Sequence, residues 1–210
     1  TPGPGVYVEN WNGSAWTEVA DLNATHFAYL GASGTSTSGL AFGGGGGNAP
    51  AAYALTEFWD GTSWTEVADM STARGAHGSA RNGTSSSTLA YGGSRGPAGP
   101  SYTNVSEEWT ITAPSPTTFA KQIEGQLYFN STANAFKETL QDAASGAWAS
   151  IASGNTARRV ASGAGGSTSD GIVIAGYPQE NEVETWNGTS WTEVAEVNTA
   201  RGDAGASSNS

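Results

Sequence analysis

The stretch WDGTSWTEVADMSTARG, residues 59–75, decides the fold because the chain uses it more than once. A block of Trp, Asn or Asp, Gly, two small residues, Trp and Thr-Glu-Val-Ala returns at residues 11–20 and 186–195. The later part of the pattern returns again at residues 147–158, where the first Trp is missing. A pattern that recurs along a chain is typical of a structural repeat.

The spacing of the copies predicts five units. The second tryptophans are Trp16, Trp64, Trp148 and Trp191, at spacings of 48, 84 and 43 residues. Because 84 is close to twice 43, we interpret residues 114–152 as a degenerate unit. This unit begins with Pro114 and Pro116, so its first strand is expected to be short or absent. A glutamate stands two residues before the first Trp position of each unit: Glu9, Glu57, Glu107, Glu184 and, in the degenerate unit, Glu138.

Each unit is predicted to form four short antiparallel strands. Small residues follow Thr-Ala-Arg, and an apolar run such as STLAYGG (87–93) comes next, as expected for two successive strands. Asn-Gly or Asp-Gly then indicates a hairpin, because these residues tolerate a positive φ. Four strands in about 40–50 residues, repeated, are typical of a β-propeller blade. We predict blades at about 23–68, 71–113, 117–152 and 155–195, with partial blade pieces at 5–20 and 196–208.

Composition excludes several classes of protein. The 210 residues include 30 Gly and 8 Trp but only 13% charged residues, which suits strands and tight turns better than helices. The absence of Cys excludes disulfides and thiolate metal sites. A net charge of −11 with only 8 Lys and Arg argues against a nucleic-acid partner. No apolar run approaches the ~20 residues of a membrane span, so we expect no membrane insertion.

Several motifs resemble kelch repeats. LAYGG (89–93), NVSEEW (104–109) and MSTAR (70–74) match a double glycine, a glutamate with paired aromatics, and an arginine that leads into the next blade. The resemblance implies an all-β fold, with one kelch-like β-propeller domain over residues 1–210. The domain is expected to be a fragment of a larger ring or a ring closed by a split blade, and we favour the fragment. At Ile174-Ala175-Gly176 a second glycine is missing, so a different turn is expected there.

A second resemblance concerns residues 124–138, EGQLYFNSTANAFKE. Together with the Trp-Asn-Gly-Thr-Ser-Trp blocks, this segment is similar to virion proteins of marine tailed phages, in fibres or associated with capsids. The resemblance implies a structural and attachment role in a virion or another extracellular setting. The partners that it implies are other virion proteins, a second copy of the chain, or a host surface glycan.

Candidate catalytic and metal-binding residues are few. His26 and His77 are the two histidines, and neither stands in a motif with a nucleophile or an acid. No His cluster or Asp-x-Asn-x-Asp loop suggests a metal. We therefore predict no enzyme, no cofactor and no catalytic or metal site, and we assign no ligand-binding residue.

The sequence is also compared with what two other classes of function require. The first is a secreted carbohydrate-binding or galactose-oxidase-like propeller. The copper site implied by that resemblance includes a Cys-modified Tyr, and this chain has no Cys. The second is an intracellular kelch adaptor, which would carry a helical partner domain that this segment does not contain.

The repeated residues are interpreted as structural. Each glutamate is expected to accept a hydrogen bond inside its own blade from the repeating arginines, and the tryptophans are expected to pack on the sheets. The arginines are Arg74, Arg158 and Arg201. Arg201-Gly202-Asp203 matches an adhesion tripeptide, but Ala76 holds the place of Asp203 in another copy, which favours scaffold.

Loop residues are the remaining candidates for ligand contact. Tyr53 and Tyr102 are the tyrosines on which a sugar is expected to stack, if the chain binds one. Six positions satisfy the Asn-x-Ser/Thr rule for glycosylation: Asn12, Asn23, Asn82, Asn104, Asn130 and Asn187. Asn12 and Asn187 also belong to the predicted hairpin turns.

Overall fold

Every regular element in the described part of the chain is a β-strand. The computed structural model describes residues 6–26, 29–45, 51–80, 83–96, 102–111, 127–130, 135–138, 146–159, 162–178 and 180–202. The strands are β1 (Glu9–Trp11), β2 (Trp16–Glu18), β3 (Gly31–Thr35), β4 (Ser38–Phe42), β5 (Thr56–Trp59), β6 (Trp64–Glu66), β7 (Gly78–Ser79), β8 (Ser87–Tyr91), β9 (Ser106–Ile111), β10 (Leu127–Asn130), β11 (Ala135–Glu138), β12 (Gly146–Ile151), β13 (Ser162–Ser167), β14 (Asp170–Gly176), β15 (Glu180–Trp186) and β16 (Trp191–Val194).

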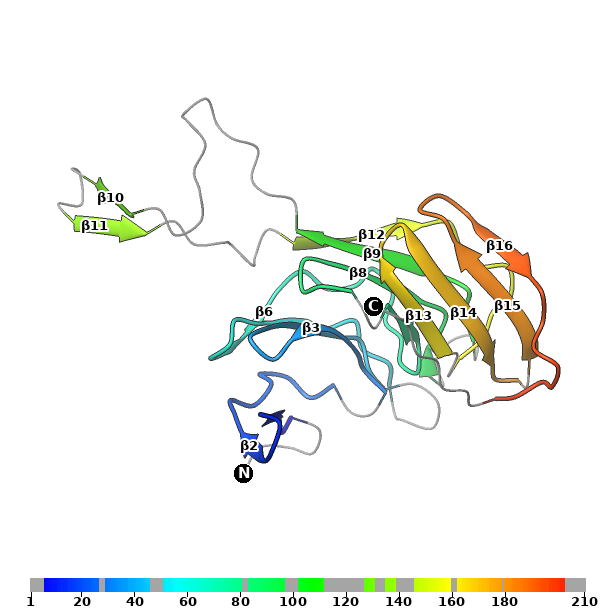
Figure 1. Cartoon of the computed structure of the whole chain (residues 1–210), viewed down its shortest axis with the longest axis horizontal. Coiled ribbons are helices and arrows are strands. Elements are labelled where there is room, and N and C mark those ends of the chain that lie inside the picture. Colours follow the sequence, from blue (N-terminus) through cyan, green and yellow to red (C-terminus); the bar gives the residue numbers. More distant parts are fainter. Residues whose placement is uncertain are drawn as a thin grey trace.

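The strands form three four-stranded antiparallel sheets, which correspond to three of the four blades predicted from the repeat. Blade 1 is β3–β6, blade 2 is β7, β8, β9 and β12, and blade 3 is β13–β16. β1 and β2 form an N-terminal hairpin with the tryptophan pairing of the third and fourth strands of blade 1. Figure 1 shows these sheets following one another from the N-terminal hairpin at the lower left to blade 3 at the right. The prediction of an all-β fold with four-stranded antiparallel blades is confirmed.

The turn between the paired tryptophans is built by one side chain and one glycine. Asp60 Oδ1 accepts hydrogen bonds from the backbone N–H groups of Thr62 and Ser63, both at 2.8 Å. Gly61 has a φ of 96°, which an L-residue rarely adopts. Asn12-Gly13 and Asn187-Gly188 form the same turn. The glycine alone takes the positive φ, and Asp or Asn contributes its side chain instead.

The first strands of the blades carry small residues because aromatic rings occupy the space above them. A Cβ atom on Gly31 of β3 would overlap the ring of Phe42, and one on Gly78 of β7 would overlap the ring of Tyr91. Phe42 and Tyr91 end the apolar second strands, where both are buried. The small stretch and the apolar run of the repeat are therefore complementary in volume.

The fourth strand of blade 2 comes from beyond a long insertion. β12 pairs with β9 over six residue pairs, and Trp148 lies opposite Trp109. These two tryptophans belong to one hairpin, and residues 112–145 connect its two strands. In blades 1 and 3 a four-residue turn makes this connection. The interpretation of residues 114–152 as a separate unit, with a blade at 117–152, is therefore wrong. The 84-residue spacing from Trp64 to Trp148 is therefore one repeat of 50 residues, the distance from Trp59 to Trp109, plus 34 additional residues between Trp109 and Trp148.

The insertion contains a hairpin of its own. β10 and β11 pair with each other and with no other strand of the described residues. Glu138 lies on β11 opposite Leu127, so its assignment to the series of blade glutamates is also wrong. Pro114 and Pro116 lie outside the described residues, so the prediction of a short strand there stays a prediction.

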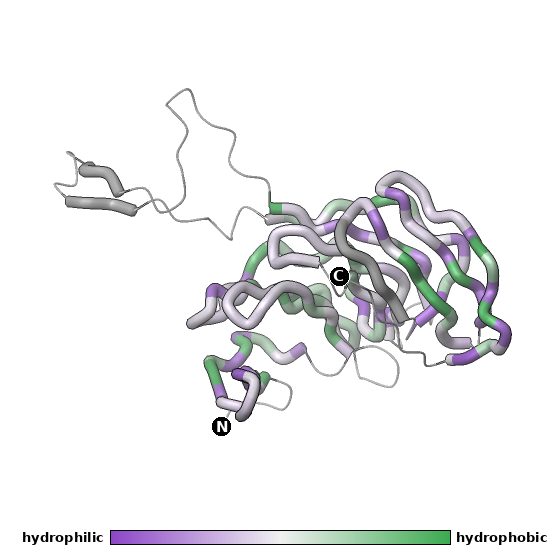
Figure 2. The backbone as a smooth tube through the Cα atoms, viewed as in Figure 1, coloured by the Kyte–Doolittle hydropathy of each residue, from purple (hydrophilic) through white to green (hydrophobic). Residues whose placement is uncertain are grey.

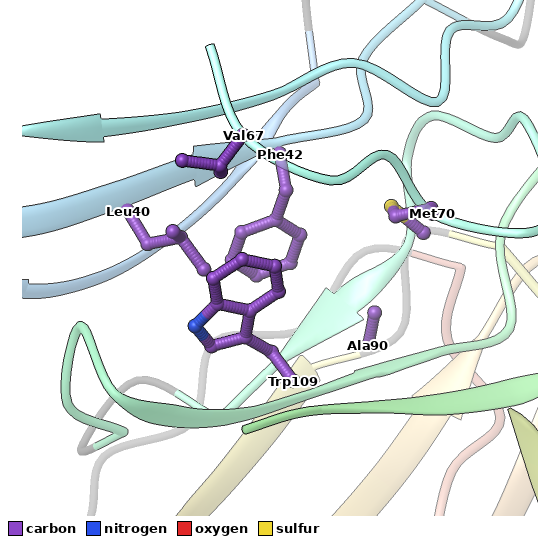
Figure 3. Close-up of a cluster of buried hydrophobic side chains, with 6 residues drawn as sticks. All are labelled: Leu40, Phe42, Val67, Met70, Ala90 and Trp109. Atoms are coloured by element: carbon purple, nitrogen blue, oxygen red, sulfur yellow. The ribbon is translucent and has the colours of Figure 1, made fainter. Parts of the chain in front are cut away.

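Neighbouring blades bury their apolar faces against each other. The cluster between blades 1 and 2 consists of Leu40, Phe42, Val67, Met70, Ala90 and Trp109. Figure 3 shows the indole of Trp109 reaching from blade 2 toward Phe42 and Leu40 of blade 1. Figure 2 shows hydrophobic residues within the sheets. The core is therefore a series of interfaces between blades, as expected for a repeat protein in which each unit contacts its neighbours.

The turn after β14 keeps the backbone conformation of its counterparts. Ala175 has a φ of 54°, where Gly43 has 67° and Gly92 has 61°. The glycine that follows is at 128° in blade 3 and at 121° and 108° in blades 1 and 2. The expectation of a different turn at Ile174-Ala175-Gly176 is therefore wrong, and an alanine is held in the left-handed region at a steric cost.

Candidate functional site

The third-strand glutamate of blade 2 forms a buried ion pair with the residue that leads into that blade. Arg74 Nη2 donates to Glu107 Oε1 at 2.8 Å, and both side chains are fully buried. Arg74 Nη1 donates to the carbonyl oxygens of Val105 at 2.5 Å and Gly92 at 3.4 Å. Ser71 donates its N–H and its hydroxyl to Glu107 Oε2, both at 2.7 Å. The buried carboxylate is therefore both paired and hydrogen-bonded, as a buried charge requires.

Blades 1 and 3 repeat this arrangement. Arg158 Nη2 donates to Glu184 Oε2 at 2.6 Å. In blade 1 a histidine replaces the arginine: His26 Nδ1 lies 2.7 Å from Gly43 O, and Nε2 lies 3.2 Å from Glu57 Oε1. Each ring nitrogen of His26 thus lies within hydrogen-bond distance of an oxygen of blade 1. The prediction that the glutamates bond to the repeating arginines is confirmed in blades 2 and 3, and His26 takes the same role.

These environments shift the ionisation of the paired groups. Burial lowers the pKa of Arg74 to about 10, in spite of the Glu107 carboxylate beside it, so the guanidinium is still charged at neutral pH. Burial alone would raise the pKa of Glu57, but hydrogen bonds from His26, Asn23 and Ala24 outweigh it and hold that pKa below its ordinary value. Both groups are charged in the folded protein at pH 7.

We call His26, Arg74, Arg158 and Arg201 the junction residues. The main chain of Arg74 is bound to blade 1: its carbonyl accepts the N–H of Gly44 at 3.0 Å, and its N–H donates to Tyr53 O at 3.0 Å. Its side chain is bound to Glu107 of blade 2. Arg158 makes the same connection between blades 2 and 3. The ion pairs therefore hold consecutive blades together.

His77 lies between blades 1 and 2. Its ring is 5.4 Å from that of Phe42, centroid to centroid. Both ring nitrogens are buried and have no hydrogen-bond partner in the described part of the chain. Burial, and then the charge of Arg74, lower the pKa of His77 to about 3, so the ring is neutral at pH 7. The two histidines considered for catalysis thus occupy junctions between blades.

Arg201 is the junction residue of the last repeat. Its carbonyl accepts the N–H of Gly176 at 3.1 Å, as the carbonyl of Arg158 accepts that of Gly93 at 2.8 Å. This match supports scaffold for the first residue of the adhesion-like tripeptide. Asp203 lies outside the described residues. The described part of the expected piece at 196–208 contains no strand.

All eight tryptophans belong to four hairpin pairs. The centroid distances are 5.4 Å for Trp11–Trp16, 5.2 Å for Trp59–Trp64, 5.7 Å for Trp109–Trp148 and 5.4 Å for Trp186–Trp191. The first Trp of each complete blade donates its indole N–H to a turn carbonyl: Trp59 to Ser36, Trp109 to Ser85 and Trp186 to Thr168. The tryptophans are thus packing and turn-fixing residues, as predicted.

A loop cluster of Tyr102, Tyr177 and Arg159 lies at the junction of blades 2 and 3. The two tyrosine rings meet edge to face at 5.4 Å. The guanidinium carbon of Arg159 lies 4.7 Å from the ring centroid of Tyr177 and 5.4 Å from that of Tyr102. Tyr177 is 40% exposed. Sequence reasoning selected Tyr102 but missed Tyr177 and Arg159, whose proximity comes from two different loops. Tyr53, the other tyrosine selected, is only partly exposed.

Several of the glycosylation candidates are used internally. Asn23 Nδ2 donates to Glu57 at 2.9 Å and to Trp64 O at 2.8 Å, and Asn104 Nδ2 donates to Gly154 O at 2.6 Å. Asn12 and Asn187 accept hydrogen bonds in their turns. Asn82 lies outside the described residues, and Asn130 lies on β10.

Two further features are absent from the described ranges. No group of three or more His, Asp or Glu side chains there is arranged to hold a metal ion. None of the described elements is a helix long and apolar enough to span a membrane.

The insertion at 112–145 is the feature that sequence reasoning missed. A signal for it is present: Trp109 has no Asn-Gly or Asp-Gly turn after it, and Trp148 has none before it. Two half-motifs that complete each other indicate one hairpin with an insertion. Figure 1 shows β10 and β11 apart from the three blades.

Comparison with known proteins supports the fold. No protein-family model matches the chain, and no curated protein matches it. Among solved structures, one titled "Structure of YjhT" matches with a TM-score of 0.55 and 11% identity, over 93% of this chain and 60% of that one. A fungal copper-containing alcohol oxidase of the AA5 family matches with a TM-score of 0.48 and 13% identity, over 94% of this chain and 50% of that one. This chain therefore spans about 60% of the length of the YjhT structure. The fold is a β-propeller.

Proposed function

We propose that this chain is a non-enzymatic binding propeller that attaches to a partner through the segment inserted in blade 2. The observation that carries the proposal is the hairpin Trp109–Trp148, whose turn is replaced by residues 112–145 while its strand pairing is intact. A repeat fold tolerates insertions in its turns, and such insertions commonly carry binding. The ion-paired groups of the blades are occupied in holding the blades together.

The proposed setting is a virion or another extracellular surface. Support for it comes from the resemblance of residues 124–138 to phage virion proteins. The proposed partners are neighbouring virion proteins. The β10–β11 hairpin lies within this segment, so the element that resembles those proteins is also the element that departs from the repeat.

The turn of blade 3 can replace the insertion in a variant that tests this proposal. Blade 3 joins its two tryptophans by Asn-Gly-Thr-Ser, residues 187–190. Replacing residues 110–147 by Asn-Gly-Thr-Ser joins Trp109 to Trp148 by the turn that their register requires. We expect this variant to keep the fold, which thermal unfolding and tryptophan fluorescence measure. We expect it to lose binding to virions or host cells, which a co-sedimentation assay measures. Asp60→Asn, which changes the blade 1 turn to the same tetrapeptide, is the matched control. Undiminished co-sedimentation of the grafted variant would overturn the proposal.

A second candidate function is binding of a host glycan at the loop cluster of Tyr102, Tyr177 and Arg159. Aromatic faces bind the apolar faces of sugar rings, and a guanidinium donates hydrogen bonds to sugar oxygens. Tyr177→Ala should then abolish retention on immobilised glycans. Tyr29→Ala is the control: Tyr29 is an exposed tyrosine outside the cluster, 61% exposed against 40% for Tyr177, and its loss should leave retention unchanged. Equal retention of both variants would exclude this cluster.

We also propose that the chain has no oxidase activity. The copper site that the galactose-oxidase resemblance implies needs a Cys cross-linked to a Tyr, and the chain has no Cys, so its residues do not fit that group. Incubation with copper and a primary alcohol, followed by a peroxide assay, is expected to give no signal above buffer. Peroxide formation that depends on the protein would contradict this part of the proposal.

A further inference from the structure

The loop cluster of Tyr102, Tyr177 and Arg159 lies at a junction that has a direct counterpart one blade earlier. Arg159 and Tyr177 exchange both backbone hydrogen bonds, at 3.2 and 2.8 Å. At the junction of blades 1 and 2, Gly75 and Ser94 exchange the same pair of bonds, at 3.0 and 2.8 Å. Arg159 therefore takes the place of Gly75, and Tyr177 takes the place of Ser94.

Tyr102 also takes the place of a small residue. The carbonyl of Thr103 accepts the N–H of the junction arginine, as the carbonyl of Tyr53 does at the junction of blades 1 and 2. Tyr102 precedes Thr103, and Ala52 precedes Tyr53. Two tyrosines and an arginine thus stand where the other junction has alanine, serine and glycine. The backbone bonds of a junction form without these large side chains, so the large side chains are candidates for binding.

The guanidinium of Arg159 is held by aromatic rings and has no carboxylate partner among the described residues. Its carbon atom lies over the two tyrosine rings, 4.7 and 5.4 Å from their centroids. The carboxylates of this junction, Glu182 and Glu184, are bonded to Arg158 instead, at 3.4 and 2.6 Å. The Nε atom of Arg159 is buried and has no acceptor in the described part of the chain. Because a guanidinium stays charged at neutral pH, this side chain carries a positive charge that no described residue neutralises.

The groups of the cluster suit a sugar that carries an acid. A guanidinium that lies over an aromatic ring keeps its in-plane N–H groups for hydrogen bonds, and such groups bind carboxylate and sulfate oxygens strongly. The tyrosines beside it offer an apolar ring face together with a hydroxyl. An oxyanion on a sugar ring satisfies both kinds of group at once.

We propose that the cluster binds an acidic glycan, with Arg159 bound to a carboxylate or sulfate group and the two tyrosines in contact with the sugar that carries it. This inference rests on the second candidate function, glycan binding at the loop cluster, and adds that the bound sugar is an acid. It does not depend on the role proposed for residues 112–145, because no residue of the cluster lies in that insertion.

The test measures retention of the protein on two matched pairs of immobilised polysaccharides. Polygalacturonate carries carboxylates and its methyl ester does not, and dextran sulfate carries sulfates and dextran does not. We expect wild type to be retained on at least one acidic member and released from its neutral partner. The net charge of −11 makes the comparison selective, because the protein as a whole repels a polyanion. The acidic member that retains the protein identifies the oxyanion.

Three variants locate the binding. Arg159→Met keeps much of the aliphatic stem and should weaken binding to the acidic polysaccharide roughly 10- to 100-fold, as expected for the loss of charged hydrogen bonds. Arg95→Met is the matched control, because it removes the same charge from the loop before Tyr102, and it should bind as wild type does. Arg159→Lys keeps the charge without the planar set of donors and should fall between wild type and Arg159→Met. Urea unfolding of each variant checks that the blades remain folded.

Three outcomes overturn the proposal. Equal retention on the acidic and neutral members, unchanged in Arg159→Met, refutes an acidic ligand but leaves glycan binding in place. Equal losses for Arg159→Met and Arg95→Met show that binding follows net charge and not the cluster. Absence of retention on all four polysaccharides overturns the second candidate function together with this inference. If Arg159→Met does not fold, the comparison of acidic with neutral members for wild type and Arg159→Lys decides.

Discussion

Arg74→Met is the perturbation that best tests whether the ion pairs hold the blades together. Met keeps much of the aliphatic stem but removes the hydrogen bonds to Glu107, Val105 and Gly92. The Glu107 carboxylate would stay fully buried, with only Ser71 bonded to it. Removing one partner of a buried ion pair costs about 3–5 kcal/mol, which is a large part of the 5–15 kcal/mol that is typical for a domain.

Arg201→Met is the matched control, because Arg201 holds the same place in the repeat and no carboxylate of the described residues pairs with it. Its cost should stay within about 0.5 kcal/mol, as for an exposed residue away from special features. The measurement is urea unfolding at pH 7 followed by tryptophan fluorescence, at concentrations where the protein is monomeric. Adding Glu107→Gln to Arg74→Met should recover part of the lost stability, because the uncompensated charge is then gone. Equal small losses for Arg74→Met and Arg201→Met would refute the reasoning.

Three further predictions concern the packing, a turn and pH. Trp109→Ala should lower the free energy of unfolding by about 3–5 kcal/mol, because Trp109 is fully buried. Trp16→Ala should change it by no more than about 0.5 kcal/mol, because Trp16 is 64% exposed, and denaturant unfolding measures both. Ala175→Gly should raise the melting temperature, with a gain of about 0.5–1 kcal/mol, since φ is 54° there. Because the pKa of His77 is lowered to about 3, the unfolded chain binds a proton that the folded chain does not as pH falls below about 6.5. Stability should then fall toward pH 3 by at most about 1.4 kcal/mol per pH unit, and a His77→Gln variant with an unchanged slope would contradict this assignment.

Most of the local structure could be predicted from the sequence, because local residues cause it. The Asp60-Gly61 turn needs one side-chain acceptor and one residue at positive φ, and both lie within four positions. The paired glutamate and arginine could also be inferred, because a charge that recurs at one register position in a β-repeat needs a recurring partner. His26 stands at the place of the arginine when the copies are aligned. Its bonds to Gly43 and Glu57 depend on the tertiary structure.

The candidate loop cluster could be predicted only in part. Tyr102 stands in a loop and was selected for that reason. Tyr177 and Arg159 join it from another blade and from a junction, so their contact depends on how blades 2 and 3 pack.

The sequence by itself determined the unit of this protein: the hairpin between two tryptophans, the small first strand, the apolar second strand, and the glutamate with its junction residue. Only the tertiary structure decided that residues 114–152 are not a unit of their own, because it paired Trp148 with Trp109 across residues 112–145. The physical reason is that the entropy of closing a loop grows slowly, by about 0.6 kcal/mol for each doubling in length. A connection about three doublings longer than the usual turn therefore costs only about 2 kcal/mol, which the burial of Trp109 and the strand pairing of β9 with β12 outweigh. The sequence carries one sign of the insertion, the missing Asn-Gly or Asp-Gly turn after Trp109 and before Trp148, but it does not show that the two strands pair across residues 112–145.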